Sequence, residues 1–109
     1  MISVINNYFY SSQRQVFMSV AIIGGLDRLK SVYKSQGSRM GFKVKLFGQR
    51  VPGMGKRLSG VDAIVVFTGT VAHDMAAEAA RTAKRFNIPI RWSHSSGTGG
   101  LKRSLASLA

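Results

Sequence analysis

The sequence predicts an α/β protein, a small Rossmann-like or flavodoxin-like three-layer sandwich with a four-stranded parallel sheet in the order 2-1-3-4. Short apolar runs alternate with amphipathic helical segments from residue 18 onward. The segments between the runs are long enough for right-handed crossover helices, which join parallel strands. Helices on both faces of such a sheet give three layers.

The first half of the unit contains two strands and one helix. Residues 19–25 are an apolar run closed by two glycines, which is typical of a buried parallel strand. Residues 26–41 form a predicted helix. Its inner face carries Leu26, Leu29, Tyr33, Gln36 and Met40. The alternating segment 43–49 is a half-exposed second strand, and residues 50–61 are a loop with at most one helical turn.

The second half repeats the alternation. Residues 62–69 are the third strand, and residues 70–86 are the strongest predicted helix because alanine has the highest helix propensity. Its apolar positions are Ala72, Ala76, Ala79, Ala83 and Phe86. Residues 88–94 are the fourth strand, and residues 100–109 form a short last helix.

We expect a single α/β domain over residues 18–109, preceded by an N-terminal extension. The extension, residues 1–17, is interpreted as an extra strand, a segment exchanged between copies or a disordered segment. A chain of 109 residues buries roughly 60–65% of its unfolded surface, so its core is thin. A four-stranded sheet also has two open edges. Both features predict a homo-oligomer.

The charge balance is strongly basic. Sixteen Lys and Arg residues against four Asp and Glu residues give a net charge of +12, which attracts phosphate, nucleic acid and other anions. The absence of cysteine excludes disulfides, thiolate metal sites and a cysteine nucleophile. No run approaches the ~20 apolar residues of a membrane span. We expect a cytoplasmic protein with no membrane partner, although a chain without cysteine also suits an oxidising compartment.

The acidic residues do not favour an enzyme. They are Asp27, Asp62, Asp74 and Glu78, and no two have the spacing of acid–base partners. Ser95 and Ser96 lie near His94 but lack the strand–turn–helix GxSxG motif of a serine nucleophile. We therefore expect a binding protein without catalytic residues.

Three loops of small residues follow the first, third and fourth predicted strands. Parallel α/β sheets bind ligands beyond the carboxyl ends of their strands, near the switch in strand order. Glycines let backbone N–H groups approach a ligand, and helix N-termini favour anions. The predicted contacts to an anionic small-molecule ligand are Gly24, Gly25, Arg28, Thr68, Thr70, Arg91 and Ser96. Tight turns without a ligand are the alternative.

The two histidines of the chain fall in these loops. If Thr70 caps the helix that follows the third strand, His73 is the third residue of that helix. His94 ends the fourth strand between two serines. Imidazole is a common metal ligand, so His73 and His94 are the candidate metal ligands, and a packing role is the alternative for each.

Three segments carry a family resemblance: "VAIIGGLDRL" at 20–29, "VVFTGTVAHDM" at 65–75 and "IPIRWSHSSGTGGLKRSL" at 88–105. In this order and spacing they resemble domain-of-unknown-function family 2325, over about residues 18–108. The chain departs from the family pattern at Ala72, where a serine is expected, and at Trp92, which is inserted between Arg91 and Ser93.

The resemblance implies a small oligomer-forming Rossmann-like domain, with haem binding in some members. Haem needs an axial imidazole or thioether, an apolar slot for the macrocycle, and cations for its propionates. His73 and His94 can supply the axial imidazole. The candidates for the apolar slot are Met54, Phe67, Val71, Met75 and Trp92, and the candidates for the propionate contacts are Arg28, Arg50, Lys56, Arg57 and Arg91. We expect haem as the cofactor of a sensor, storage or electron-transfer protein, with His73 as the preferred axial ligand and His94 as a second ligand or a hydrogen-bond donor. The spacing alone does not select haem over another aromatic anion.

The alternative function is a regulatory module that binds nucleic acid or nucleotide phosphates through its basic surface. The basic residues of the predicted outer helices are Lys30, Lys34, Arg81, Lys84, Arg85, Lys102 and Arg103. No helix-turn-helix or RNA-recognition motif is present in the sequence, so such binding would be electrostatic.

Overall fold

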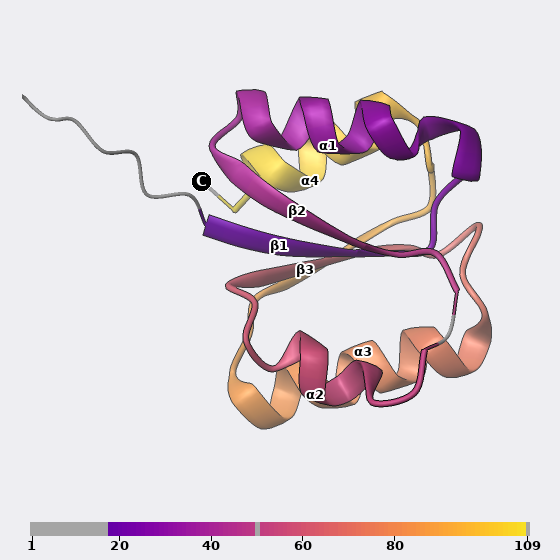
Figure 1. Ribbon diagram of the computed structural model, residues 1–109, viewed down its shortest axis with the longest axis vertical. Coiled ribbons are helices and arrows are strands. Elements are labelled where there is room, and N and C mark those ends of the chain that lie inside the picture. The colour runs from indigo at the N-terminus through magenta and orange to yellow at the C-terminus, as the bar shows by residue number, and fades with distance from the viewer. Residues whose placement is uncertain (1–17, 50, 109) are drawn as a thin grey trace, which may run out of the picture.

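A computed structural model describes residues 18–49 and 51–108 (Figure 1). One sheet lies between two helical layers, as predicted (Figure 1). Helices α1 (Lys30–Arg39) and α4 (Thr98–Ala106) cover one face, and α2 (Met54–Leu58) and α3 (His73–Phe86) cover the other. The extension at residues 1–17 lies outside the described residues, so the predictions made for it stay predictions.

The sheet has the predicted order. Strands β1 (Met18–Ile23), β2 (Phe42–Phe47), β3 (Ala63–Phe67) and β4 (Ile90–Ser93) are arranged as β2-β1-β3-β4, and every pair is parallel. The chain passes from β1 to β2 on one side and then returns to place β3 on the other side of β1. The switch point, where ligands enter such folds, therefore lies between β1 and β3.

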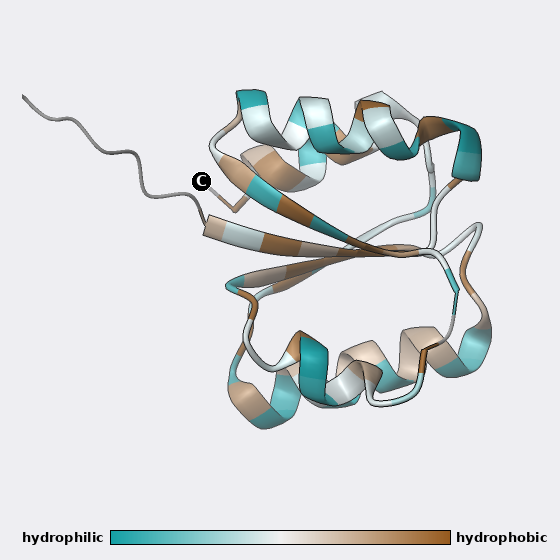
Figure 2. Cartoon of the chain, in the orientation of Figure 1, coloured by the Kyte–Doolittle hydropathy of each residue, from teal (hydrophilic) through white to brown (hydrophobic). Residues whose placement is uncertain are grey.

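The core has two parts because successive side chains of a strand point to opposite faces. Val20 and Ile22 pack on the side of α1 and α4, whereas Ala21 and Ile23 pack on the side of α2 and α3. All five residues of β3 are buried. Figure 2 shows the result: the central strands β1 and β3 are mainly hydrophobic, whereas β2 alternates with hydrophilic positions.

The two long helices begin later than the sequence predicts. A short 3-10 turn, Asp27–Leu29, precedes α1. Helix α3 begins at His73, because Ala72 is its extended N-cap and the Thr70 side chain bonds to other loops instead of capping the helix. His73 is therefore the first helical residue rather than the third.

The inner face of α3 also differs from the prediction. Its buried residues are Met75, Ala79, Thr82 and Ala83. Phe86, expected on the apolar face, is 47% exposed and lies beside Arg85, whose Cζ is 5.3 Å from the ring centroid. Residues 50–61, expected as a loop with at most one helical turn, contain the five-residue helix α2, which is slightly longer than one turn.

Candidate functional site

Hydrogen bonds join the three predicted loops at the carboxyl edge of the sheet. The Gly25 N–H donates to Thr70 Oγ1 over 2.8 Å, and this bond spans the switch point between β1 and β3. Thr70 Oγ1 and Ser96 Oγ lie 2.8 Å apart, which adds the loop after β4. The structure therefore brings Gly25, Thr70 and Ser96 together, as the strand order requires.

Tyr33 on α1 completes this network. Its hydroxyl donates to the Ser96 carbonyl over 2.6 Å and accepts the Leu26 N–H at 3.0 Å. The side chain is 1% exposed, and its ring centroid lies 5.3 Å from that of Phe67. The sequence pattern places Tyr33 only at an inner position of a helix. A buried tyrosine hydroxyl needs a hydrogen-bond partner. A tyrosine at an inner position of the predicted helix was therefore the signal in the sequence for a residue that hydrogen-bonds to neighbouring loops.

The glycine pair is explained by backbone geometry. Gly24 and Gly25 have φ values of +90° and +99°, which L side chains rarely adopt. A Cβ on Gly24 would lie 3.0 Å from Val71 Cβ, and one on Gly25 would lie 2.8 Å from a Tyr33 ring carbon. The hollow that these glycines line with Tyr33 leaves no room for a water molecule. Leu46 and Gly48 also line this hollow, so it lies between the loops that follow β1 and β2.

The other predicted contacts lie apart from this network. Arg91 is in the middle of β4, where its Nε donates to Ser107 Oγ over 2.9 Å and its Nη2 to the Ser107 carbonyl over 3.3 Å. It therefore ties β4 to the C-terminal end of α4. Arg28 is exposed in the 3-10 turn, and Thr68 is exposed with its N–H bonded to the Ser93 carbonyl.

The apolar residues expected to line one slot are divided between the two cores. Phe67 packs on the side of α1 and α4, whereas Met54 and Met75 pack on the side of α2 and α3. All three are at most 2% exposed. The predicted set cannot line one slot, because the sheet lies between its members. Trp92, 50% exposed, is the member of the set that is available at the surface.

Both histidines are exposed at the carboxyl edge. His94 packs against the loop that leads to His73: a Cβ on Gly69 would lie 2.7 Å from the His94 carbonyl oxygen and 3.7 Å from its Cε1. Within residues 18–49 and 51–108, no group of three or more His, Cys, Asp or Glu side chains could hold a metal ion.

A groove of about 470 Å³ runs beside the edge strand β4. Trp92, His94 and Arg103 line it, so an indole, an imidazole and a guanidinium share one surface hollow. His73 does not line this groove. The sequence placed Trp92 and His94 as candidates but did not associate Arg103 with them. The return of α4 along β4 brings Arg103 to that strand.

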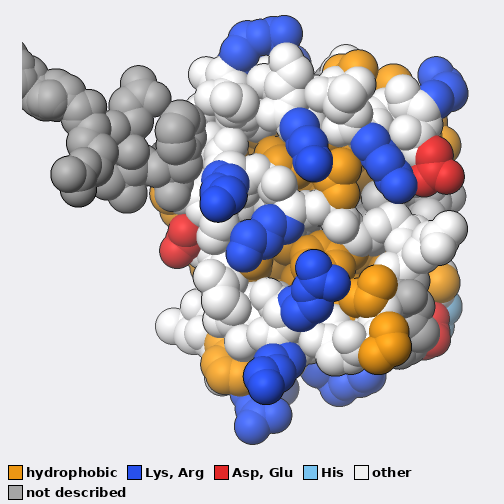
Figure 3. Space-filling view, in the orientation of Figure 1, with side chains coloured by type: hydrophobic (Ala, Val, Ile, Leu, Met, Phe, Trp, Pro, Cys, Tyr) orange, Lys and Arg blue, Asp and Glu red, His pale blue; other side chains and the backbone are white. Residues whose placement is uncertain are grey.

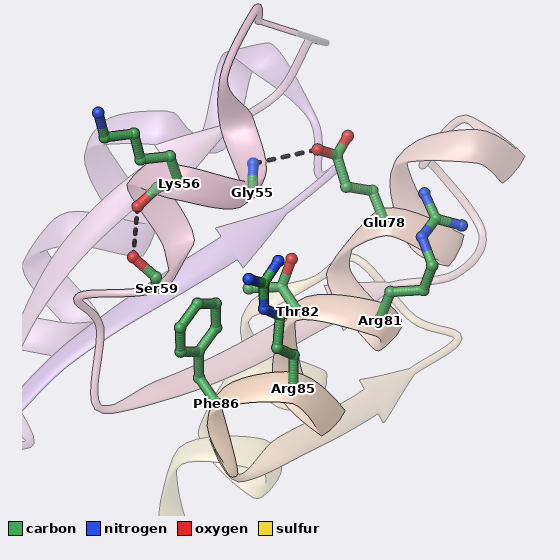
Figure 4. A pocket seen from close by; sticks show the side chains of 8 residues that line it. All are labelled: Gly55, Lys56, Ser59, Glu78, Arg81, Thr82, Arg85 and Phe86. Carbon is green, nitrogen blue, oxygen red and sulfur yellow. Dashed lines mark hydrogen bonds between the residues drawn. The ribbon is translucent and has the colours of Figure 1, made fainter.

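A second hollow, of about 530 Å³, lies between α2 and α3 (Figure 4). The Gly55 N–H donates to Glu78 Oε2 over 3.1 Å across it, and the 93%-buried Thr82 lies at its base. Lys56 and Arg81 extend outward at its margins (Figure 4). The sequence analysis did not predict this hollow, because it depends on how α2 packs against α3.

The chain matches one family model over residues 19–108, and its description is an uncharacterized protein conserved in bacteria, DUF2325. The chain belongs to this family. A search of the curated proteins and of the solved structures finds no match to the chain. Among the described residues of this DUF2325 protein, no helix has the length and hydropathy needed to cross a membrane.

Proposed function

We propose that this DUF2325 protein binds haem between two copies of the chain, in the groove beside β4, with His94 as the axial ligand. The observation that carries the proposal is that this groove contains an imidazole, a half-exposed indole and a guanidinium. These are the chemical groups that an axial bond, a macrocycle face and a propionate each require. Homo-oligomeric assembly and a cytoplasmic location are parts of the same proposal.

The fit within a single chain is incomplete, which is why the proposal needs a second copy. The side chains of the groove suit haem, but three of the apolar candidates, Met54, Phe67 and Met75, lie in the core. The groove beside β4 is open because that strand has one neighbour among the described strands. A second chain packed along this edge would cover Trp92 and shield the macrocycle from water.

Each lining residue has a role that follows from its chemistry. His94 would hold the iron through one ring nitrogen, Trp92 would contact the flat macrocycle, and Arg103 would pair with a propionate. Bound haem would supply redox or gas-ligand chemistry at its iron. His73 lies outside the groove and serves as the second candidate ligand, from the same chain or from the neighbouring one.

The experiment is a haemin titration of the full chain followed by visible absorption, with His94→Ala and His73→Ala variants. Both histidines are exposed, so neither substitution removes core packing. We expect a sharp Soret band that saturates at a fixed ratio of haem to chain, survives in His73→Ala and is lost in His94→Ala. A broad band that never saturates and is unchanged in both variants would overturn the proposal.

A further inference from the structure

Strand β2 forms the other open edge of the sheet and carries cations along it. Lys43 and Lys45 are exposed and alternate with the half-buried Val44 and Leu46. Among the described strands, β2 pairs with β1 alone, so its outer backbone edge is unpaired. This edge lies opposite β4 and is therefore separate from the groove that contains His94.

Two adjoining hollows follow this edge. One of about 490 Å³ extends from Lys34 on α1 across Lys45 to Arg57 on α2. The other, of about 270 Å³, lies between Lys34 and Lys43. They share Lys34 and Val44 and so form one continuous depression. Figure 3 shows a face on which Lys and Arg side chains form a band across the molecule, with hydrophobic surface between them.

We call the cations of this depression the β2 face: Lys34, Lys43, Lys45 and Arg57. They come from three different elements, and neither hollow has an acidic side chain in its lining. The Arg57 Cζ lies 5.3 Å from the centroid of the Phe47 ring, a cation–π contact that favours this position. Since like charges gathered without acids strengthen the local field, the β2 face attracts polyanions more than a scattered set of cations would.

Apart from Lys34, which belongs to the β2 face, the basic residues that the sequence assigned to the outer helices do not form such a face. Lys102 and Arg103 belong to the layer of α1 and α4, whereas Lys84 and Arg85 belong to α3 on the opposite side of the sheet. Lys30 is in an ion pair with Asp27, at 3.5 Å. The sheet therefore divides the predicted basic surface, and the strand β2 provides a different one.

We propose that the β2 face binds the phosphate backbone of single-stranded nucleic acid, independently of sequence. Lys43 and Lys45 are two residues apart on a strand, a separation of about 6.8 Å that suits successive phosphates of an extended chain. Lys34 and Arg57 extend the cationic track beyond the strand. Val44 and Leu46 line the same hollow but are half-buried, because they pack against the core on the side of α1. The depression has no exposed aromatic or amide side chain in its lining. The β2 face therefore does not distinguish one base from another.

Lysines on an edge strand also discourage the pairing of sheets from two molecules. That role accounts for Lys43 and Lys45, which lie on the edge itself. It does not account for Lys34 and Arg57, which extend from helices on the two layers and line the same depression. The combined arrangement is therefore better explained by an extended anion that crosses the edge.

The test compares two variants of the full chain that lose the same charge from the same residue types. One is Lys43→Gln/Lys45→Gln/Arg57→Gln on the β2 face, and the control is Lys84→Gln/Lys102→Gln/Arg85→Gln on the outer helices. The probe is a fluorescein-labelled oligothymidine of about 20 nucleotides, titrated at several salt concentrations. Thermal unfolding of each variant checks that both remain folded.

We expect the β2-face variant to bind at least about tenfold more weakly than the parent at about 0.1 M salt, and the control to stay within about threefold. The slope of log K against log salt should fall by about 2 in the β2-face variant, because three phosphate contacts on a single strand are lost. His94→Ala should bind the oligonucleotide as the parent does, which separates this proposal from that of haem binding.

Three results would overturn the proposal. Equal loss of affinity in both variants would mean that net charge alone drives binding. No binding of oligothymidine by the parent at about 0.1 M salt would exclude the ligand class. Binding of polyglutamate but not oligothymidine would assign the β2 face to an acidic protein partner instead.

Discussion

The hydroxyl of Tyr33 on α1 donates a 2.6 Å hydrogen bond to the carbonyl of Ser96, in the loop after β4. The two residues are 63 positions apart, and the bond is buried. The same hydroxyl accepts the Leu26 N–H, so one phenol links the loop after β1 with the loop after β4. This bond fixes the positions of two loops at the carboxyl edge, including the one that follows His94.

Tyr33→Phe should therefore destabilise the protein by about 1–3 kcal/mol, because the Leu26 N–H and the Ser96 carbonyl would lose their shared partner inside the protein. Urea unfolding monitored by circular dichroism measures the change. Ser31→Ala is the matched control, since it removes an exposed hydroxyl from the same helix, and it should change stability by less than about 0.5 kcal/mol. Equal effects of the two substitutions would show that the phenol does not link the loops.

Thr70 and Thr68 offer a second matched pair, two residues apart in one loop. Thr70→Val removes the acceptor of the Gly25 N–H and the partner of Ser96 Oγ, so it should cost about 1 kcal/mol. Thr70 is itself exposed, so water replaces part of the lost hydrogen bonding and limits the loss. Thr68→Val makes the same chemical change at an exposed side chain and should be nearly neutral in a thermal melt. A larger loss in Thr68→Val would contradict the network.

Gly37 of α1 lies against Val44 of β2, where an added Cβ would clash with Val44 Cγ2. Valine has a stiff side chain, so it cannot simply rotate away. Gly37→Ala should therefore destabilise the protein by about 1–3 kcal/mol through overpacking, reduced by the better helix propensity of alanine.

A double-mutant cycle isolates this contact. Gly37→Ala combined with Val44→Ala should be less destabilising than the sum of the two single substitutions, because the second removes the clashing methyl group. Chemical denaturation of the four proteins gives the coupling. Strict additivity would mean that α1 and β2 do not approach as closely as Gly37 and Val44 indicate.

The strand order was predictable because the sequence alternates buried runs and helices at crossover spacing. The fully buried β3 appears in the sequence as the uninterrupted run from Ala63 to Phe67, and the structure confirms it. The convergence of Gly25, Thr70 and Ser96 followed from the same topology, because parallel strands end at one edge. These features depend on patterns that are local in the sequence.

The remaining features depend on contacts between distant residues. Helix α3 begins at His73, later than the sequence predicts, because Thr70 hydrogen-bonds to the loops after β1 and β4 rather than to its own helix. The apolar residues expected to line one haem slot lie on opposite faces of the sheet. Phe67 points to one face because side chains alternate along a strand, whereas Met75 packs on the other face. The hollow between α2 and α3 requires the packing of two helices. No local pattern encodes these contacts.

The central claim is that haem binds between two copies of the chain through His94. The most direct measurement is sedimentation velocity of the haemin-titrated protein with detection at the Soret wavelength, beside the His94→Ala variant. The account predicts that the Soret absorbance sediments with an assembly of at least two chains in the parent and that His94→Ala carries no such absorbance. Soret absorbance that sediments at the mass of one chain, or that persists with the assembly in His94→Ala, would contradict it.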